Sequence, residues 1–274
     1  MVDELTFEQE LRAPGGPDLI RANLLFAREI AYPGLKPSRY LETLDAWAER
    51  VAPSCENGSA VERAVSLSSF LFREIGLRGN DDDYYDPRNS YLNEVIDRRL
   101  GLPIALSVLY IEMARRIGLP AFGVGLPGHF IVGVEDPEES FLLDPFHGGM
   151  LLTRDDAAAL VRSVTGFGGP LDPGWLKPVS PRDILVRMLL NLRGAYIRRE
   201  AWTEAVATVE RLRLLQPAEP EHLRDLGMLC QRAGALRKAV GHFEDYLLMV
   251  GDTDTTEPIR QNLNVLIRQL ARLN

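Results

Sequence analysis

Sequence patterns typical of β-strands occur in only one short part of this chain. Three segments rich in β-forming residues follow one another there, separated by turn signals: AFGVGL (121–126), HFIVGVE (129–135) and SFLLDP (140–145). The chain on either side has apolar residues at three- and four-residue spacing, which is typical of helices. The pattern therefore predicts an α+β fold with one small antiparallel sheet.

The helix expected just before these strands is apolar nearly all round. Its sequence, GLPIALSVLYIEMARRIGLP, places Pro103 in the first turn, where the missing N–H of proline costs nothing. Apolar residues dominate from Ile104 to Met113, and the helix is expected to end at Gly118. A helix of this kind is buried rather than amphipathic.

Amphipathic helices are expected on both sides of this region. Three precede it, over 18–30, 38–51 and 59–76, and a polar, turn-rich loop follows the third. Ser38 is expected to cap the second helix, whereas Ser59 and Glu62 have the spacing of a capping box. The segment after the strands, 150–166, is expected to return to helix with Thr153 as its cap.

The chain beyond Pro181 is helical and contains a repeat. Ala205-Val206 and Ala239-Val240 lie 34 residues apart, which is the period of a tetratricopeptide repeat, and the alternative is a generic helical bundle. We expect about two repeats and a capping helix. The domains are accordingly predicted over 1–165 and 181–274, joined by a linker rich in glycine and proline over 166–180.

Composition excludes several classes of protein. The net charge of −8 argues against a nucleic-acid binder, and no apolar run approaches the ~20 residues of a membrane span. The first residues lack the basic and apolar regions of a secretion signal, so we expect a cytoplasmic protein. The two cysteines, Cys55 and Cys230, form neither a disulfide framework nor a zinc pattern.

Two polar residues stand out against the apolar strands. His129 begins one strand and Asp144 ends the next, fifteen residues later, so a hairpin can bring them side by side. A nucleophile at the N-terminus of the preceding helix would complete a catalytic arrangement, because the histidine can take its proton and the aspartate can orient the histidine.

The segments NSYLNEVIDRRLGLPIALSVLYIEMARRIGLP, GLPGHFIVGV and LLDPFHGG resemble the bacterial SirB family. In that family a transglutaminase-like domain, a relative of the papain fold, is joined to tetratricopeptide repeats. The resemblance covers most of the chain from Leu19 onwards. It implies that His129 and Asp144 occupy two positions of the catalytic triad, and that Pro103 stands where active enzymes have the nucleophilic cysteine. The domain would then have lost its nucleophile.

Other readings of these residues stay open. Ser107, one turn after Pro103, is a weaker nucleophile that more often bonds a backbone carbonyl. The His129–Asp144 pair could simply tie two strands together, or line a non-catalytic pocket with Gly128 and His147 as further members. A metal site formed by His129, Asp144 and His147 is a further reading, but the spacing of these ligands is not diagnostic. We expect no metal and no cofactor, because no phosphate-binding glycine loop or metal motif is present.

The expected function is protein–protein interaction or regulation. The repeats would bind a peptide or a helix of a protein partner, with no role for nucleic acid or membrane, and the oligomeric state is left open. The rival is a hydrolase or amide transferase that uses His129 and Asp144 with an unidentified nucleophile. A third reading is a structural subunit of an assembly. The rival predicts an open cleft around His129, whereas the adaptor predicts that this side chain is packed.

Overall fold

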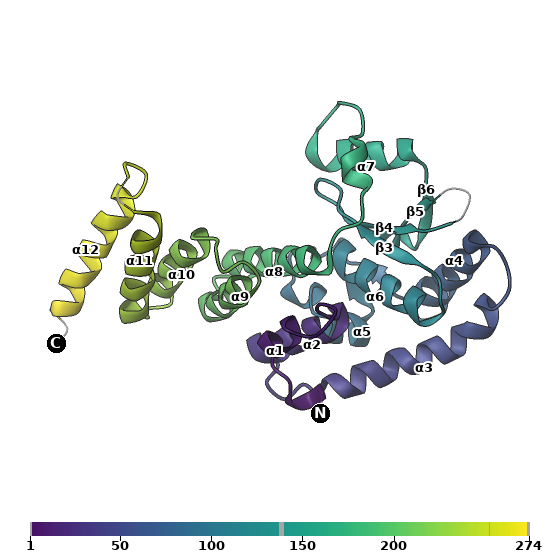
Figure 1. Cartoon of the computed structure of the whole chain (residues 1–274), viewed down its shortest axis with the longest axis horizontal. Coiled ribbons are helices and arrows are strands. Elements are labelled where there is room, and N and C mark those ends of the chain that lie inside the picture. Colours follow the sequence, from purple (N-terminus) through teal and green to yellow (C-terminus); the bar gives the residue numbers. More distant parts are fainter. Residues whose placement is uncertain (1, 137–139, 252, 273–274) are drawn as a thin grey trace. The chain divides into compact units, whose positions relative to one another are not determined.

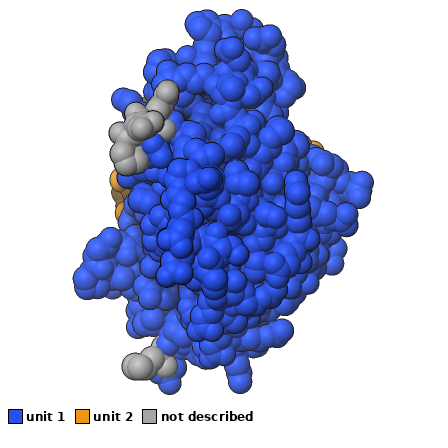
Figure 2. All heavy atoms as spheres, turned by 90° about the vertical axis from the view of Figure 1, so that its right-hand side faces the viewer, with its two compact units in different colours: residues 1–28, 32–188 blue, residues 29–31, 189–274 orange. Residues whose placement is uncertain are grey.

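The computed structural model describes residues 2–136, 140–251 and 253–272 (Figure 1). The chain forms two compact units, distinguished by colour in Figure 2. Unit 1 comprises Met1–Arg28 and Tyr32–Met188, and unit 2 comprises Glu29–Ala31 and Leu189–Asn274. Among the described helices, none is both long enough and apolar enough to cross a membrane.

Helices make up the N-terminal part of unit 1. After a short 3-10 helix, η1 (Val2–Glu4), come α1 (Phe7–Leu11), α2 (Leu19–Ile30), α3 (Pro37–Cys55) and α4 (Ala60–Ser68). The predicted capping box of α4 is confirmed, because the Ser59 hydroxyl accepts from the Glu62 N–H and the Glu62 carboxylate accepts from the Ser59 N–H. The same helical segment continues as a π-helix, η2 (Ser69–Glu74), which the sequence pattern does not distinguish from α-helix.

The prediction that Ser38 caps α3 is wrong. Lys36 is the N-cap, Pro37 is the first helical residue, and Ser38 lies inside the first turn. The carboxylate of Asp3 accepts from the Ser38 N–H at 2.9 Å and from its hydroxyl at 2.8 Å. A carboxylate distant in sequence therefore accepts the free N–H of Ser38 in the first turn of the helix. The residues around Ser38 give no indication of this contact.

The middle of unit 1 surrounds a buried helix. The predicted loop contains a two-residue strand, β1 (Arg78–Gly79), and a 3-10 helix, η3 (Pro87–Asn89). Next come α5 (Leu92–Arg98), β2 (Leu100–Gly101), which pairs in parallel with β1, and α6 (Pro103–Arg116). Pro103 is the first residue of α6 and nearly the whole helix is buried, so both predictions for this helix are confirmed.

The main sheet has four antiparallel strands in sequence order. They are β3 (Ala121–Val124), β4 (Ile131–Val134), β5 (Phe141–Asp144) and β6 (Met150–Leu152). The three predicted strands are confirmed; the turn expected between the second and third includes residues 137–139, which lie outside the described residues. The sequence predicts a helix over 150–166 with Thr153 as its cap, and Thr153 does cap α7 (Arg154–Thr165), but residues 150–152 before the cap form β6. Three residues are too few to show the alternation that marks a strand.

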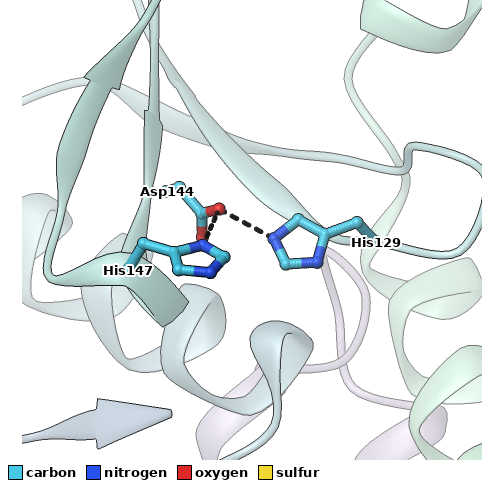
Figure 3. A group of neighbouring side chains, drawn as sticks. All are labelled: His129, Asp144 and His147. Atoms are coloured by element: carbon cyan, nitrogen blue, oxygen red, sulfur yellow. Dashed lines mark hydrogen bonds and ion pairs between the residues drawn. The ribbon is translucent and has the colours of Figure 1, made fainter. Parts of the chain in front are cut away.

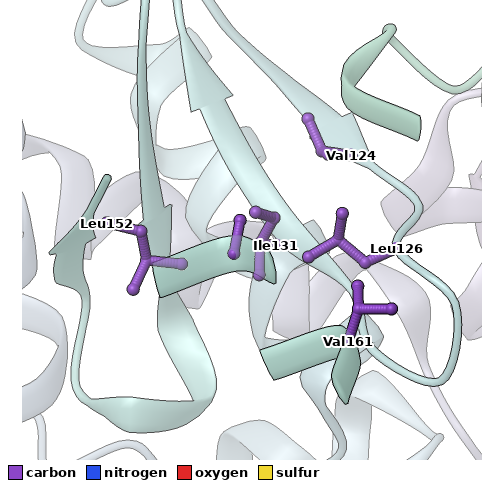
Figure 4. Packing of buried hydrophobic residues seen from close by; sticks show 6 residues of the cluster. Val124, Leu126, Ile131, Leu152 and Val161 are labelled. Carbon is purple, nitrogen blue, oxygen red and sulfur yellow. The ribbon is translucent and has the colours of Figure 1, made fainter. Parts of the chain in front are cut away.

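Both faces of the sheet are covered. On one face, the sheet packs against Ala157 and Val161 of α7 (Arg154–Thr165). The buried residues on the sheet side of this cluster are Val124, Leu126, Ile131 and Leu152, of which Leu126 lies just after β3 (Figure 4). Helix α6 packs against β3 and β4. All four residues of β4 are consequently buried, so the sheet provides a rigid support for the side chains at the ends of its strands.

The segment expected as a linker, 166–180, makes ordered contacts within unit 1. It contains a 3-10 helix, η5 (Pro173–Leu176). The Val179 N–H donates to the Gly123 carbonyl at 2.9 Å, and Pro178 forms an isolated bridge with Val124 at the edge of the sheet. The boundary between the two compact units falls further along, inside α8 (Pro181–Arg198).

Unit 2 is all-α. After α8 it contains α9 (Trp202–Leu215), α10 (Glu221–Arg232), α11 (Leu236–Val250) and α12 (Glu257–Ala271), and each helix from α9 to α12 packs on the next. The core shared by the last three helices consists of Cys230, Ala239, Phe243, Leu263 and Leu266. Small residues allow the close approach, since the ring of Phe243 lies directly against Gly227.

Candidate functional site

Three polar side chains meet at the end of the main sheet (Figure 3). Nε2 of His129 lies 2.9 Å from Oδ2 of Asp144, and Nδ1 of His147 lies 2.7 Å from the same oxygen. The Asp144 side chain is fully buried and that of His129 is 6% exposed, whereas that of His147 is 48% exposed. The structure therefore brings together three of the residues singled out in the sequence.

A short helical turn places His147 beside the aspartate. Asp144 is the last residue of β5 and also the N-cap of the 3-10 helix η4 (Pro145–His147). Its Oδ1 accepts the backbone N–H of Phe146 at 2.9 Å, which leaves Oδ2 for the two imidazoles. This cap fixes the carboxylate of Asp144. The helical turn that follows brings His147, three residues later, back to the same carboxylate.

A tight turn and a half-buried arginine place His129. Its N–H donates to the Leu126 carbonyl at 3.2 Å across Pro127 and Gly128, and Gly128 has φ +74°, as a type II turn requires at this position. Nη2 of Arg187 donates to the carbonyls of Leu126 at 3.0 Å and His129 at 2.6 Å. Gly128 is therefore a turn residue, and Arg187 holds both ends of the turn.

The two histidines govern the ionisation of Asp144. Burial acts to raise the pKa of this carboxyl, but hydrogen bonds and charge from His129, followed by those from His147, outweigh burial and lower the pKa below its ordinary value of 3.8. Burial likewise lowers the pKa of the Arg187 guanidinium. Asp144 is accordingly an ionised acceptor at neutral pH.

Neither predicted position for a nucleophile supplies one. Pro103 is buried at the start of α6 and has no group that can attack. Ser107 is fully buried, and its hydroxyl donates to the Phe130 carbonyl at 3.3 Å. Within the described part of the chain, Ser107 makes no hydrogen bond to a histidine. The α6 serine thus connects the helix to β4 rather than to an imidazole.

Aromatic rings pack beside the histidines. Phe146 packs edge-on against His129 and His147, with ring centroids 6.0 Å and 5.3 Å apart. Tyr84 packs in turn on Phe146 at 6.2 Å. The arrangement can orient an imidazole through Asp144, or hold a metal ion through His129, Asp144 and His147, whose ligand atoms all lie within 4.8 Å of one another.

Sequence reasoning did not identify Arg187 or Phe146 as parts of this site. Arg187 lies 58 residues after His129 in the chain and within a helix assigned to the repeats, so no local pattern connects the two. Phe146 stands in LLDPFHGG, two residues after Asp144, and its position beside a polar cluster was the one signal available.

Comparison with known proteins agrees with this architecture. The family model of the transglutaminase-like superfamily matches residues 38–190, and a tetratricopeptide repeat model matches residues 192–264. The chain belongs to the transglutaminase-like superfamily. The predicted combination of a transglutaminase-like domain with tetratricopeptide repeats is therefore confirmed.

Several bacterial proteins are similar in sequence to this chain over much of its length. A UPF0162 protein of Xylella fastidiosa is 36% identical over 89% of this chain and 88% of its own length. A UPF0162 protein of Pseudomonas aeruginosa is 36% identical over 65% of this chain and 64% of its own length. One from Vibrio cholerae is 27% identical over 85% and 88%, respectively. The long matches to the first and third span both units.

Proposed function

We propose that this transglutaminase-like protein does not catalyse acyl transfer and acts as an interaction or regulatory adaptor in the cytoplasm. The observation that carries the proposal is the absence of a nucleophile beside the His129–Asp144 pair in the described part of the chain. The position implied for the cysteine is occupied by Pro103, and the Ser107 hydroxyl is engaged by a backbone carbonyl. The small exposed fraction of His129, 6%, also fits a packed side chain better than an open cleft.

A groove on unit 2 is the surface proposed for the partner. It has a volume of about 440 Å³ and lies between α8 and α10, where Ile197 and Met228 are 39% and 50% exposed. The ion pair of Arg193 with Asp225, at 2.5 Å, also lines it. A peptide or helix with an apolar anchor and flanking charges matches this groove, because apolar anchors supply most of the binding energy.

Affinity capture from an extract of the native cell tests the proposal. The full-length protein is compared with Met228→Asp, which places a charge in the groove, and with Met249→Asp as a matched control. Met249 is 47% exposed on α11 and does not line the groove. We expect Met228→Asp to lose a partner that the wild type and Met249→Asp retain. Equal capture by all three proteins would contradict a role for the groove.

The alternative is a hydrolase or amide transferase of the transglutaminase or protease type. It is favoured by one observation: Asp144 binds Nε2 of His129, so Nδ1 is the nitrogen left for a substrate or nucleophile. His129→Ala, included in the same capture experiment and checked for folding by circular dichroism, separates the two functions. A partner whose mass changes with the wild type but not with His129→Ala would establish chemistry and exclude a pure adaptor.

A further inference from the structure

We propose that His129, Asp144 and His147 form a binding site for a divalent first-row transition-metal ion, with Zn²⁺ as the best match. Nε2 of His129, Oδ2 of Asp144 and Nδ1 of His147 all lie within 4.8 Å of one another. The two imidazole nitrogens, one from the turn before β4 and one from the short helix η4, thus converge on the carboxylate oxygen of Asp144 at the end of β5 (Figure 3). This site does not depend on the adaptor function proposed above.

The donor atoms select the class of ion. Two imidazole nitrogens and one carboxylate oxygen are ligands typical of Zn²⁺ and of its neighbours Co²⁺, Ni²⁺ and Cu²⁺. Mg²⁺ and Ca²⁺ prefer sets made of oxygen atoms alone. A set of three protein ligands leaves a fourth position for a water molecule. Water can reach this position because the His147 side chain is half-exposed.

The distances require His147 to move. Ligand atoms around a tetrahedral zinc ion with bonds of about 2.0–2.1 Å lie about 3.3 Å apart. The two nitrogen–oxygen distances of 2.9 Å and 2.7 Å are those of hydrogen bonds, so each must lengthen by about half an ångström. The two imidazole nitrogens lie within 4.8 Å of each other and must reach the same spacing. His147 is able to move, because it is 48% exposed and lies in a three-residue helix.

The surrounding groups hold the other two ligands. Oδ1 of Asp144 accepts the Phe146 N–H, so the carboxylate keeps Oδ2 directed at the imidazoles. Arg187 donates to the carbonyl of His129 and fixes the backbone of that residue. Hydrogen bonds of this kind orient the ligands of natural metal sites, and their loss weakens metal binding.

Charge also favours a cation at this point. Asp144 is fully buried, and within the described residues its side chain bonds two imidazoles and one backbone N–H, with no lysine or arginine. A buried carboxylate is costly unless a positive charge compensates it. A dication bound beside Oδ2 would supply that positive charge.

Metal titration of the full-length, tag-free protein tests the inference. The protein is treated with a chelator, dialysed and titrated with Co²⁺, whose visible absorption reports ligand number; Zn²⁺ is then added as competitor. His147→Ala removes the most exposed ligand and is expected to fold. His242→Gln is the matched control, since the chain has four histidines and this one lies in unit 2.

We expect the wild type and His242→Gln to bind one Co²⁺ per chain, which Zn²⁺ displaces. His147→Ala is expected to bind Co²⁺ at least about tenfold more weakly and to lose the visible absorption bands, because removing a group that holds a metal costs tenfold or more. Two results would overturn the proposal: no saturable uptake of Co²⁺ by the wild type, or the same uptake by His147→Ala.

Discussion

Gly128 and Gly148 share a backbone conformation but differ in their surroundings. Both have φ of +74°, which lies in the left-handed region that favours glycine. A Cβ built on Gly128 would lie 2.4 Å from Cγ1 of Val164, whereas one built on Gly148 would meet nothing within 4 Å. Gly128 precedes His129 and Gly148 follows His147. A substitution at Gly148 meets backbone strain alone, whereas one at Gly128 meets backbone strain and a steric clash.

Replacing each glycine by alanine gives a prediction at this scale. Gly148→Ala is expected to destabilise the protein by about 1–2 kcal/mol, the cost of the left-handed conformation. Gly128→Ala is expected to cost about 1–3 kcal/mol more, because Val164 must shift to admit the methyl group. Urea denaturation of both variants measures the difference, and equal free energies of unfolding would show that the turn relaxes away from α7.

Polar side chains around the site are satisfied by partners distant in sequence. Arg187 binds the two carbonyls of the Leu126–His129 turn, and its guanidinium lies over the ring of Phe130 at 5.3 Å. Ser107, on α6, donates to the carbonyl of Phe130. The residues adjacent to His129 are therefore held by contacts from both α6 and α8, which preorganises the imidazole without any local sequence signal.

At the scale of elements, close helix packing in unit 2 depends on one glycine. A Cβ on Gly227 of α10 would lie 2.4 Å from Cε1 of Phe243 on α11. Gly241, in the interior of α11, has nothing within 4 Å of its would-be Cβ. Both glycines are helical, so they differ chiefly in what lies beside them.

The same substitution is accordingly expected to have opposite signs at the two positions. Gly227→Ala should destabilise the protein by about 1–3 kcal/mol through overpacking against Phe243. Gly241→Ala should stabilise it by about 0.5–1 kcal/mol, because glycine in a helix interior is less favourable than alanine by that amount. Thermal and urea unfolding of the two variants checks the signs. Destabilisation by both would mean that α11 needs a glycine for another reason.

At the scale of the whole molecule, two histidines of unit 2 couple stability to pH. Burial, the largest influence, lowers the pKa of His222 and of His242 below the ordinary value of 6.5, and the charge of Arg213 acts in the same direction on both. The folded state therefore favours the neutral imidazoles. Below pH 6.5 the unfolded chain binds more protons than the folded one, so stability is full above this pH and falls as the pH drops toward the lowered values.

This coupling predicts a measurable difference between two proteins. The wild type should lose free energy of unfolding between pH 7.5 and 5.5, and the double variant His222→Gln, His242→Gln should lose less. Both proteins contain His129 and His147, so the contribution of those residues cancels in the comparison. Urea titrations at the two pH values provide the measurement, and identical losses would contradict the proposed burial effect.

The sequence by itself determined the elements whose causes are local. The capping box of Ser59 and Glu62, the proline at the start of α6 and the three strands from 121 to 144 all follow from residues within a few positions of one another. The 34-residue period determined the repeats in the same way, because each repeat carries its own packing residues. The resemblance to a known family then supplied the joining of the two domains.

Only the tertiary structure decided how the candidate site is assembled. It replaced the expected cap of α3 with the carboxylate of Asp3, and it added β6 to the sheet. It brought His147 to the oxygen that also binds His129, and it placed Arg187 behind the turn. These features arise from hydrogen bonds between segments far apart in sequence or from a three-residue turn, and neither leaves a periodic pattern along the chain.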